Sequence, residues 1–342
     1  MTAAGSLAPV PDRQSDGPRL PEPRGPLTGH VLRHLVQAPH VLPAAPHVRH
    51  ADPLGDDDFQ LALYLCYELH YRGLAGVDER WEWDPSLLAF RRGLEDEFER
   101  ALVRLVGPTP VPAGTIPDQL WALVDAAGGP SLSAYVAESG TLEQVRELAV
   151  HRSAYQLKEA DPHTWAIPRL AGTAKAAMVE IQADEYGAGV ADEMHASLFA
   201  VTMAALGLDA TYGAYLDRIP GVTLATVNLI SLFGLHRRWR GALVGHLAVF
   251  EMTSVGPMAR YAQALERLGV AREARRFYDV HVVADAHHQT VASEAMAAGL
   301  AADDPALAAD ILFGAAAVMA VESRFAAHVL AAWAEGRSSL RR

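Results

Sequence analysis

Cysteine and basic charge are both scarce in this chain. Its 342 residues include one cysteine, Cys66, which excludes an intramolecular disulfide framework and any cluster or zinc site that needs several thiolates. Lysine and arginine number 29 against 41 acidic residues, so the formal net charge is −12. An acidic chain without a basic block is a poor candidate for binding nucleic acid or an anionic membrane. The single thiol fits a reducing compartment, and we expect a cytoplasmic protein.

Other common signals are also missing. No run of about 18 apolar residues predicts a transmembrane helix, and the N-terminus lacks the basic and apolar regions of a secretory signal. We find no glycine-rich phosphate loop, no GxSxG motif and no alternation of period two. The sequence therefore gives no sign of a β-sheet or of a nucleotide-binding domain.

Proline is concentrated at the N-terminus. Ten of the 21 prolines lie between Met1 and Pro53. This composition predicts a flexible tail over about the first 25 residues, followed by an arm that docks near Leu32 to Leu42. We therefore divide the chain into a tail and docked arm over residues 1–50 and a folded domain over residues 51–342.

From Asp56 onward the pattern is almost entirely helical. Asp56 and its neighbours suit an N-cap and first turn, and Thr141 with Gln144 suits a capping box. Apolar residues recur at helical spacing in eight segments, namely residues 56–74, 85–106, 141–161, 173–187, 193–208, 222–256, 272–300 and 305–333. We expect the segment over 222–256 to form one or two helices that end near Gly256-Pro257. Many alanines and leucines favour an all-α bundle.

The segment HVVADAHH carries three histidines and an aspartate among small apolar residues. In a helix, His281, Asp285 and His288 are separated by four and three residues, which places them within roughly 60° on one face. The same face holds apolar residues, so it points to the core, whereas His287 points about 100° away. The stripe is either a metal site or a hydrogen-bonded Asp–His pair in a helical core.

Two further segments offer carboxylates. Glu68 shares a helical face with apolar and aromatic residues, unless it simply pairs with Arg72 at i+4. In VEIQADEYGAGVADEMH, Asp192 lies three residues before His195 and Glu185 lies ten before it. Glycines between Glu185 and His195 could break the helix and bring both to one metal. Spacing alone does not choose between Asp192 and Glu185, and a solvated acidic helix end is a third interpretation.

In combination, these motifs resemble the heme-oxygenase-like diiron oxidases, which are also described as iron-containing redox enzymes. The words YELHYRGL, HRSAYQLKEADPHTWAIPRL, VEIQADEYG, GHLAVFEMTS and FYDVHVVADAHH carry the likeness, which covers roughly Asp56 to Ala332. The resemblance implies a bundle of about seven core helices plus extra helices, without heme. It also implies a metal-binding and catalytic set made of Glu68, Glu185, His195, His281, Asp285 and His288.

Charge supports two ferrous ions in this set. Three carboxylates offset three of the four positive charges of two Fe(II), and three neutral imidazoles complete six protein ligands, which leaves open positions for O2 or substrate. We expect Glu68, His195 and one histidine of the third helix on one iron, and Glu185, Asp285 and the other histidine on its neighbour. No cofactor beyond the metal is expected, and the resemblance implies that the second iron is held loosely.

The resulting hypothesis is a non-heme diiron oxygenase or oxidase that uses O2 to oxidise a small organic substrate. In this family the reactions include N-oxygenation of amines and oxidative C–C cleavage of amino or fatty acids. Electrons would come from an external donor, and a homodimer is compatible with the sequence. The alternatives are a mononuclear iron or manganese oxidase and a non-catalytic helical protein that binds a metal or ligand.

Three polar residues outside the set have plainer interpretations. Glu251 lies in an apolar run, where a hydrogen bond in the core is about twice as plausible as a role beside the metal or substrate. Lys158 and Glu159 are interpreted as a solvated helix end.

Overall fold

The computed structural model describes residues 17–48, 50–108 and 113–342. Within these residues the fold is all-α and contains no β-strand. The α-helices are α1 (Pro26–Leu35), α2 (Asp57–Glu68), α3 (Pro85–Val106), α4 (Ile116–Ala126), α5 (Leu132–Ser139), α6 (Leu142–Gln156), α7 (Asp161–Thr164), α8 (Gly172–Glu185), α9 (His195–Ala205), α10 (Gly221–Leu235), α11 (Arg240–Arg267), α12 (Arg276–Thr290), α13 (Ala298–Asp303) and α14 (Ala308–Ala334).

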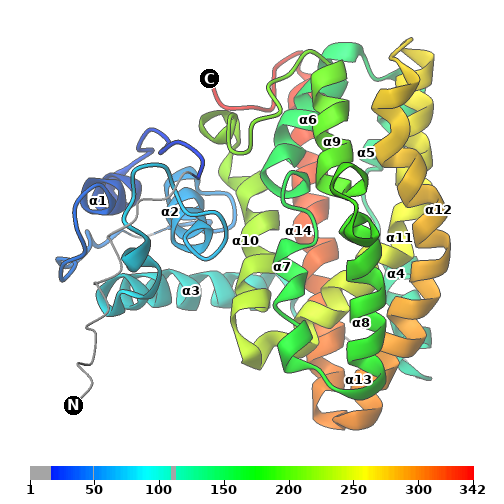
Figure 1. The fold of residues 1–342 in the computed structure, drawn as a ribbon, viewed down its shortest axis with the longest axis horizontal. Helices are drawn as coiled ribbons and strands as arrows, with labels where there is room; N and C mark the ends of the chain where they lie inside the picture. Colours follow the sequence, from blue (N-terminus) through cyan, green and yellow to red (C-terminus); the bar gives the residue numbers. More distant parts are fainter. Residues whose placement is uncertain (1–16, 49, 109–112) are drawn as a thin grey trace, which may run out of the picture.

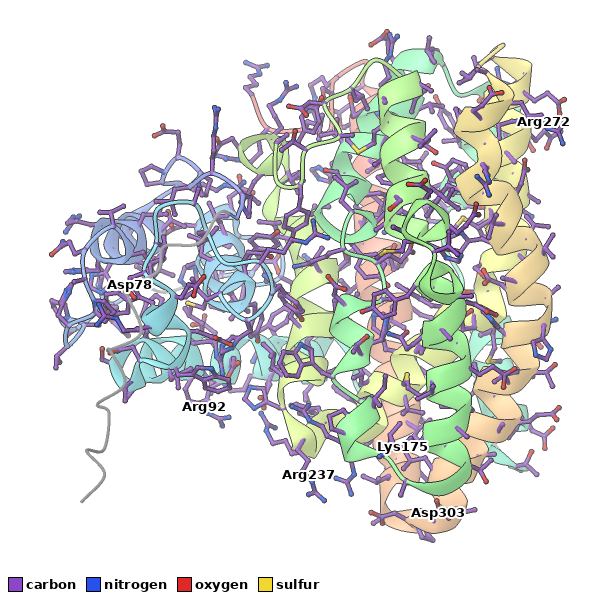
Figure 2. All side chains as sticks on the ribbon, viewed as in Figure 1. Asp78, Arg92, Lys175, Arg237, Arg272 and Asp303 are labelled. Carbon is purple, nitrogen blue, oxygen red and sulfur yellow. The ribbon has the colours of Figure 1, made fainter. Side chains whose placement is uncertain are left out.

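The helices form an upright bundle with a smaller group at its side (Figure 1). The bundle contains α6 and α8 to α14, whereas α1 and α2 lie beside it and α3 runs from them toward α10. Side chains fill the space between the helices, and charged residues such as Arg92, Arg237 and Asp303 lie at the periphery (Figure 2). This separation of apolar interior from charged surface is what a helical bundle in water requires.

The centre of the bundle is the crossing of α11 and α14. A side chain at Gly245 of α11 would collide with the backbone of Ile311, and one at Gly314 of α14 would collide with that of Ala242. Two glycines thus let the two backbones approach closely. Both helices are long and apolar enough to cross a membrane, within the segments Arg237–Arg267 and Pro305–Ala334. Because the two helices pack against each other, many of their apolar side chains lie in the core. A cytoplasmic location stays a prediction.

Several predicted helix starts are confirmed. Asp56 is the N-cap of α2 and accepts a hydrogen bond from the backbone N–H of Phe59 at 2.8 Å. Thr141 and Gln144 form the expected capping box at the start of α6. Such local hydrogen bonds satisfy helix N–H groups that have no partner within the helix, which is why these starts can be read from sequence.

The predicted end at Gly256-Pro257 is wrong. α11 continues through Pro257 to Arg267. A proline inside a helix removes one backbone hydrogen bond and costs about 3 kcal/mol in isolation. Here α11 packs along both α12 and α14, and this burial offsets the missing bond.

The expected long helix over 272–300 is divided. α12 is followed by a π-helical segment, Val291–Ala297, and then by α13. The π segment packs against α8 and α11. Such segments are rare and occur frequently at functional sites. This one begins three residues after His288.

The N-terminal region is more ordered than its proline content indicates. Residues 1–16 of the predicted flexible tail lie outside the described residues, but Arg24 already donates to the carbonyl oxygen of Leu216 at 2.6 Å. The docked arm contains α1, whose first N–H groups donate to the buried carboxylate of Asp58. Helices α1, α4 and α5 were not predicted. The division of the chain at residue 50 stays a prediction.

Candidate metal centre

The stripe on α12 points inward, as the spacing predicts. His281, Asp285 and His288 are 4%, 1% and 0% exposed, whereas the side chain of the neighbouring His287 is 67% exposed. α12 packs along α11 through this face. The question that remains is which residues on other elements meet the stripe.

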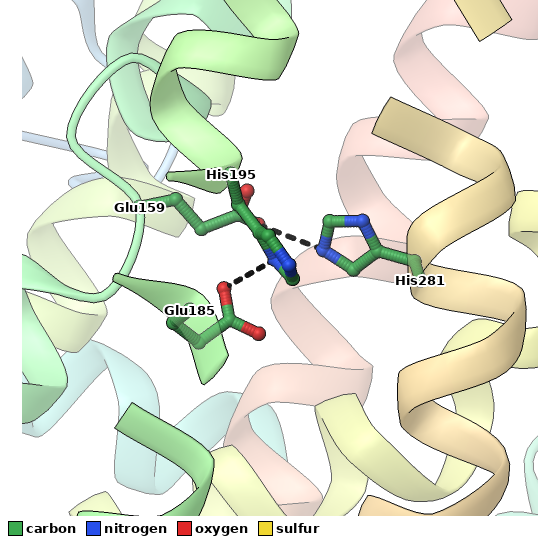
Figure 3. Close-up of side chains that lie close together, drawn as sticks. All are labelled: Glu159, Glu185, His195 and His281. Atoms are coloured by element: carbon green, nitrogen blue, oxygen red, sulfur yellow. Dashed lines mark ion pairs between the residues drawn. The ribbon is translucent and has the colours of Figure 1, made fainter. Parts of the chain in front are cut away.

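A first group of possible ligands contains Glu159, Glu185, His195 and His281 (Figure 3). Each offers one ligand atom, and these atoms all lie within 4.8 Å of one another. Glu185 Oε2 lies 2.8 Å from His195 Nδ1, and Glu159 Oε1 lies 3.8 Å from His281 Nε2. The four residues come from the turn after α6, the end of α8, the start of α9 and the middle of α12.

A second group contains Glu185, Glu251 and His288, again with ligand atoms within 4.8 Å of one another. His288 Nδ1 lies 3.3 Å from Glu251 Oε2 and 3.6 Å from Asp285 Oδ1. Asp285 therefore borders this group. Glu185 belongs to both groups, which makes the arrangement two adjoining sites with one shared carboxylate.

A glycine turn brings Glu185 and His195 together. α8 ends at Glu185, and Gly187, Ala188 and Gly189 all have positive φ, at 62°, 50° and 86°. A Cβ at Gly187 would lie 2.5 Å from the carbonyl carbon of Glu193, so the turn also needs the absence of a side chain there. Asp192, the alternative by spacing, is exposed on this turn. The structure thus supports Glu185 over Asp192.

The histidines are oriented by hydrogen bonds on their far sides. His281 Nδ1 donates to the carbonyl oxygen of Phe277 at 2.7 Å, which leaves Nε2 toward the first group. His288 Nε2 lies 2.9 Å from Asp184 Oδ2, which leaves Nδ1 toward the second group. Carboxylates and carbonyls commonly hold metal-binding imidazoles in this way. The Ser254 hydroxyl similarly donates to Asp285 Oδ2.

Some polar atoms in and beside the two groups are buried without a hydrogen-bond partner. They are Glu159 Oε2 and, beside the second group, Asp285 Oδ1, whereas Glu185 Oε2 lies against His195 Nδ1 and Glu251 Oε2 against His288 Nδ1. Unpaired buried polar atoms are costly, and one of these lies in or beside each group. Mixed carboxylate and imidazole donors suit iron or manganese better than calcium or magnesium. The residues present therefore fit a metal ion at each group.

The pKa shifts in the two groups also support metal binding. Burial raises the pKa of Glu251 to about 8, and burial together with Glu185 and Asp285 raises that of Glu159 well above its usual value. Burial alone would lower the pKa of His288, but Asp285 and Glu251 raise it to about 11. Without a metal, protons must therefore offset the crowded carboxylates. A divalent cation would take over that role.

The structure does not bring Glu68 to either group. Its Oε2 accepts hydrogen bonds from Lys158 Nζ at 2.8 Å and from the Tyr212 hydroxyl at 2.7 Å. The Lys158 and Glu68 side chains are 1% and 0% exposed, so they form a buried ion pair. Glu68 therefore lies outside both groups, and Glu159 occupies a place in the first group instead. The ion pair that the structure gives Glu68 is the one with Lys158.

The interpretation of Lys158 and Glu159 as a solvated helix end is wrong. Glu159 lies in the tight turn between α6 and α7, where the next residue, Ala160, has φ of 76°. The turn directs Lys158 toward Glu68 and the Glu159 side chain, 10% exposed, toward His281. A helical-face argument cannot find a residue that lies outside a helix, so no pattern in the sequence signalled Glu159.

The two groups open onto a cavity of about 480 Å³. Glu159, Glu185, Glu251, His281 and Asp285 line one part of it. The remaining wall is largely apolar and includes residues from α6, α11, α12 and α14. Its size suits a small organic molecule that reaches the metal groups from inside the protein.

Fold and site together form a helical bundle whose buried carboxylates and histidines could hold metal ions. A family model described as iron-containing redox enzyme matches residues 146–323, which is more than half of the chain. The chain belongs to this family, and the resemblance inferred from the motifs is confirmed. The matched segment contains every residue of the two groups and Asp285, but not Glu68. No curated protein matches the chain.

Proposed function

We propose that this protein is a non-heme diiron oxygenase or oxidase that uses O2 to oxidise a small organic substrate held in the cavity. One observation carries the proposal, namely that two groups of buried ligands share Glu185 and border one cavity. A shared carboxylate places two ions side by side, which is what a dinuclear centre requires.

Charge supports two divalent ions. Glu159, Glu185, Glu251 and Asp285 supply four negative charges, which balance the four positive charges of two Fe(II). The three histidines then act as neutral ligands. Glu159, His195 and His281 would hold one ion, and Glu251, Asp285 and His288 would hold the other, with Glu185 available to both because it belongs to both groups.

Bound iron would supply the electrons and open positions needed to react with O2. The chain's own residues orient the ligands and exclude bulk water. Hydrogen bonds from His281 to Phe277 and between His288 and Asp184 fix which ring nitrogen faces the cluster. The apolar wall positions the substrate beside the cluster, and an external donor would restore the reduced state.

The reaction type is proposed in general terms as N-oxygenation of an amine or oxidative C–C cleavage of an amino or fatty acid. The cavity accommodates any of these substrates by size. Each of these reactions needs the reacting atom of the substrate beside the carboxylate-rich end of the cavity, which residues of both metal groups line.

The test is an anaerobic Fe(II) titration of the metal-free protein, followed by rapid mixing with O2 and optical detection. We expect about two irons per chain, together with a transient visible absorption band after oxygen is added. One iron per chain with oxygen reactivity would instead establish a mononuclear oxidase. Iron uptake without any oxygen-dependent signal would indicate a metal-binding protein that is not an oxygenase.

A further inference from the structure

A half-buried ion pair lines the same cavity as the metal groups. Arg152 of α6 donates from its two terminal nitrogens to the two carboxylate oxygens of Glu322 of α14, at 2.9 and 2.7 Å. Both residues line the cavity, and their side chains remain 25% and 24% exposed. Arg152 lies one turn before the end of α6, and Glu159 lies in the turn beyond. The pair and the metal groups therefore occupy different parts of one cavity.

The pair retains hydrogen-bonding capacity. Arginine has five N–H donors and a carboxylate has about four acceptor sites, so the bidentate contact uses only part of each. Phe325 supports the guanidinium, whose central carbon lies 4.5 Å from the ring centroid. Tyr261 and Tyr278 also line the cavity. Neither hydroxyl makes a hydrogen bond within the described part of the chain, so both can bind a ligand.

Charge balance at this half-buried pair selects among ligand classes. The pair itself is neutral. A ligand with only a carboxylate would compete with Glu322 for Arg152 and leave one uncompensated negative charge, whereas an amine alone would leave one positive charge. Uncompensated charge is costly in a poorly solvated site. A ligand with both groups side by side adds no net charge and pairs each with its opposite.

We propose that Arg152 and Glu322 recognise the zwitterionic head group of an α-amino acid, with its carboxylate on Arg152 and its ammonium on Glu322. The inference rests on the proposed function in that it identifies this cavity as the substrate site. The apolar wall, which includes Leu247, Phe250 and Met319, holds an extended side chain. The end of that side chain then lies beside the metal groups, where it is oxidised.

The test compares three probes with the same butyl side chain, using calorimetric titration of the full-length protein. L-norleucine carries both charges, hexanoate lacks the ammonium, and pentan-1-amine lacks the carboxylate. We expect norleucine to bind at least about tenfold more tightly than either analogue, because it alone leaves no unpaired charge. Equal affinity for the three probes, or no binding of norleucine, would overturn the inference.

Two variants separate recognition from a purely structural role. Glu322→Gln should weaken the binding of norleucine by about tenfold. It should strengthen the binding of hexanoate, because Arg152 is then free to bind a carboxylate. Arg152→Gln should weaken the binding of norleucine by a similar factor and strengthen the binding of pentan-1-amine. A pair that only joins α6 to α14 would weaken all three probes alike. Circular dichroism checks that each variant is folded, and the neutral double variant should bind norleucine no better than its analogues.

The matched control is Arg240→Gln. Arg240 pairs with Asp304 at 3.0 Å, and neither residue lines the cavity. This variant should leave the order of the three affinities unchanged. The titration involves no turnover, so its result is independent of oxygen chemistry. Norleucine selectivity without Fe(II)-dependent oxygen consumption would refute the proposed function alone, and oxygen consumption without selectivity would refute this inference alone.

Discussion

A buried carboxylate needs a compensating charge, and two glutamates of this chain obtain it differently. Glu68 has a lysine within hydrogen-bonding distance, Lys158, and both are fully enclosed. Glu159, the next residue after that lysine, meets other carboxylates and histidines instead. Two adjacent residues of one turn thus have different roles: Lys158 forms an internal ion pair, and Glu159 belongs to a group that could bind a metal.

Exchanging each glutamate for glutamine should separate these roles. Glu159→Gln removes a ligand of the first group, so we expect the iron content to fall from about two ions per chain to one or fewer. Glu68→Gln leaves Lys158 buried without its counter-charge, which should cost about 3–5 kcal/mol of unfolding free energy while the iron content stays unchanged. Metal analysis and urea unfolding give the two quantities. Iron loss in Glu68→Gln, with normal content in Glu159→Gln, would restore the ligand set inferred from sequence.

At the scale of elements, the site depends on two interruptions of helices. The turn after α6 carries Glu159, and the turn between α8 and α9 joins Glu185 to His195. Positive φ angles occur in both, at Ala160 and at residues 187–189. Helices supply the rigid positions of α12, whereas these turns supply ligands that a continuous helix would direct elsewhere.

Gly187→Ala should damage the metal site more than the fold. Its φ of 62° disfavours any side chain by about 1–2 kcal/mol, and the added Cβ would collide with Glu193, so the turn must open and move His195. We expect iron affinity to fall at least about tenfold with helix content retained, as measured by anaerobic titration and circular dichroism.

Gly189→Ala is the control for this prediction. Gly189 also has positive φ, 86°, but a Cβ there would meet nothing within 4 Å. The Gly189→Ala variant should lose only the stability that a side chain at positive φ costs, and its iron affinity should be near normal. If the two variants lose iron affinity equally, backbone strain rather than the approach of Gly187 to Glu193 controls the site.

At the scale of the whole molecule, the metal cluster is a concentration of like charge inside an apolar bundle. In the metal-free protein, burial raises the pKa of Glu251 to about 8, so this carboxyl is largely protonated at neutral pH, and burial shifts the pKa of Glu159 in the same direction. The unfolded chain would ionise them near 4.5. His195 and His288 also have raised pKa values, because neighbouring acidic groups outweigh burial. The folded state therefore binds more protons than the unfolded state.

Stability of the metal-free protein should consequently fall as pH rises from 6.5 to about 8. Over this window each proton held only by the folded state costs about 2 kcal/mol, and we expect the Tm to drop by several degrees. Buried histidines with lowered pKa values, such as His246, act in the opposite direction around and below pH 6.5, and their effect fades as the pH rises above it. Calorimetry at the two pH values measures the change.

Bound metal should remove this dependence of stability on pH. Saturating Mn(II), which does not consume oxygen, takes the place of the protons, so the Tm should change little or rise between the two pH values. Glu251→Gln should reduce the fall in the metal-free protein, because it removes one titrating group. A Tm of the metal-free protein that rises from pH 6.5 to 8 would contradict the proton-binding argument.

The features that depend on local chemistry could be predicted from the sequence alone. Capping at Asp56 and Thr141 and the inward stripe of His281, Asp285 and His288 follow from hydrogen bonds and periodicity within one helix, and the structure confirms them. The family resemblance was likewise carried by short motifs. It also favoured Glu185 over Asp192, and the structure places Glu185 in both groups.

Only the tertiary structure decided which glutamate of the N-terminal half meets α12. Glu68 and Glu159 are both carboxylates beside apolar residues, and nothing local distinguishes their destinations. The choice arises because the turn after α6 directs Lys158 to one side and Glu159 to the other. Likewise, helix α11 continues through Pro257 because α12 and α14 pack along it. Both outcomes depend on contacts between residues far apart in the chain, which periodicity within one segment cannot reveal.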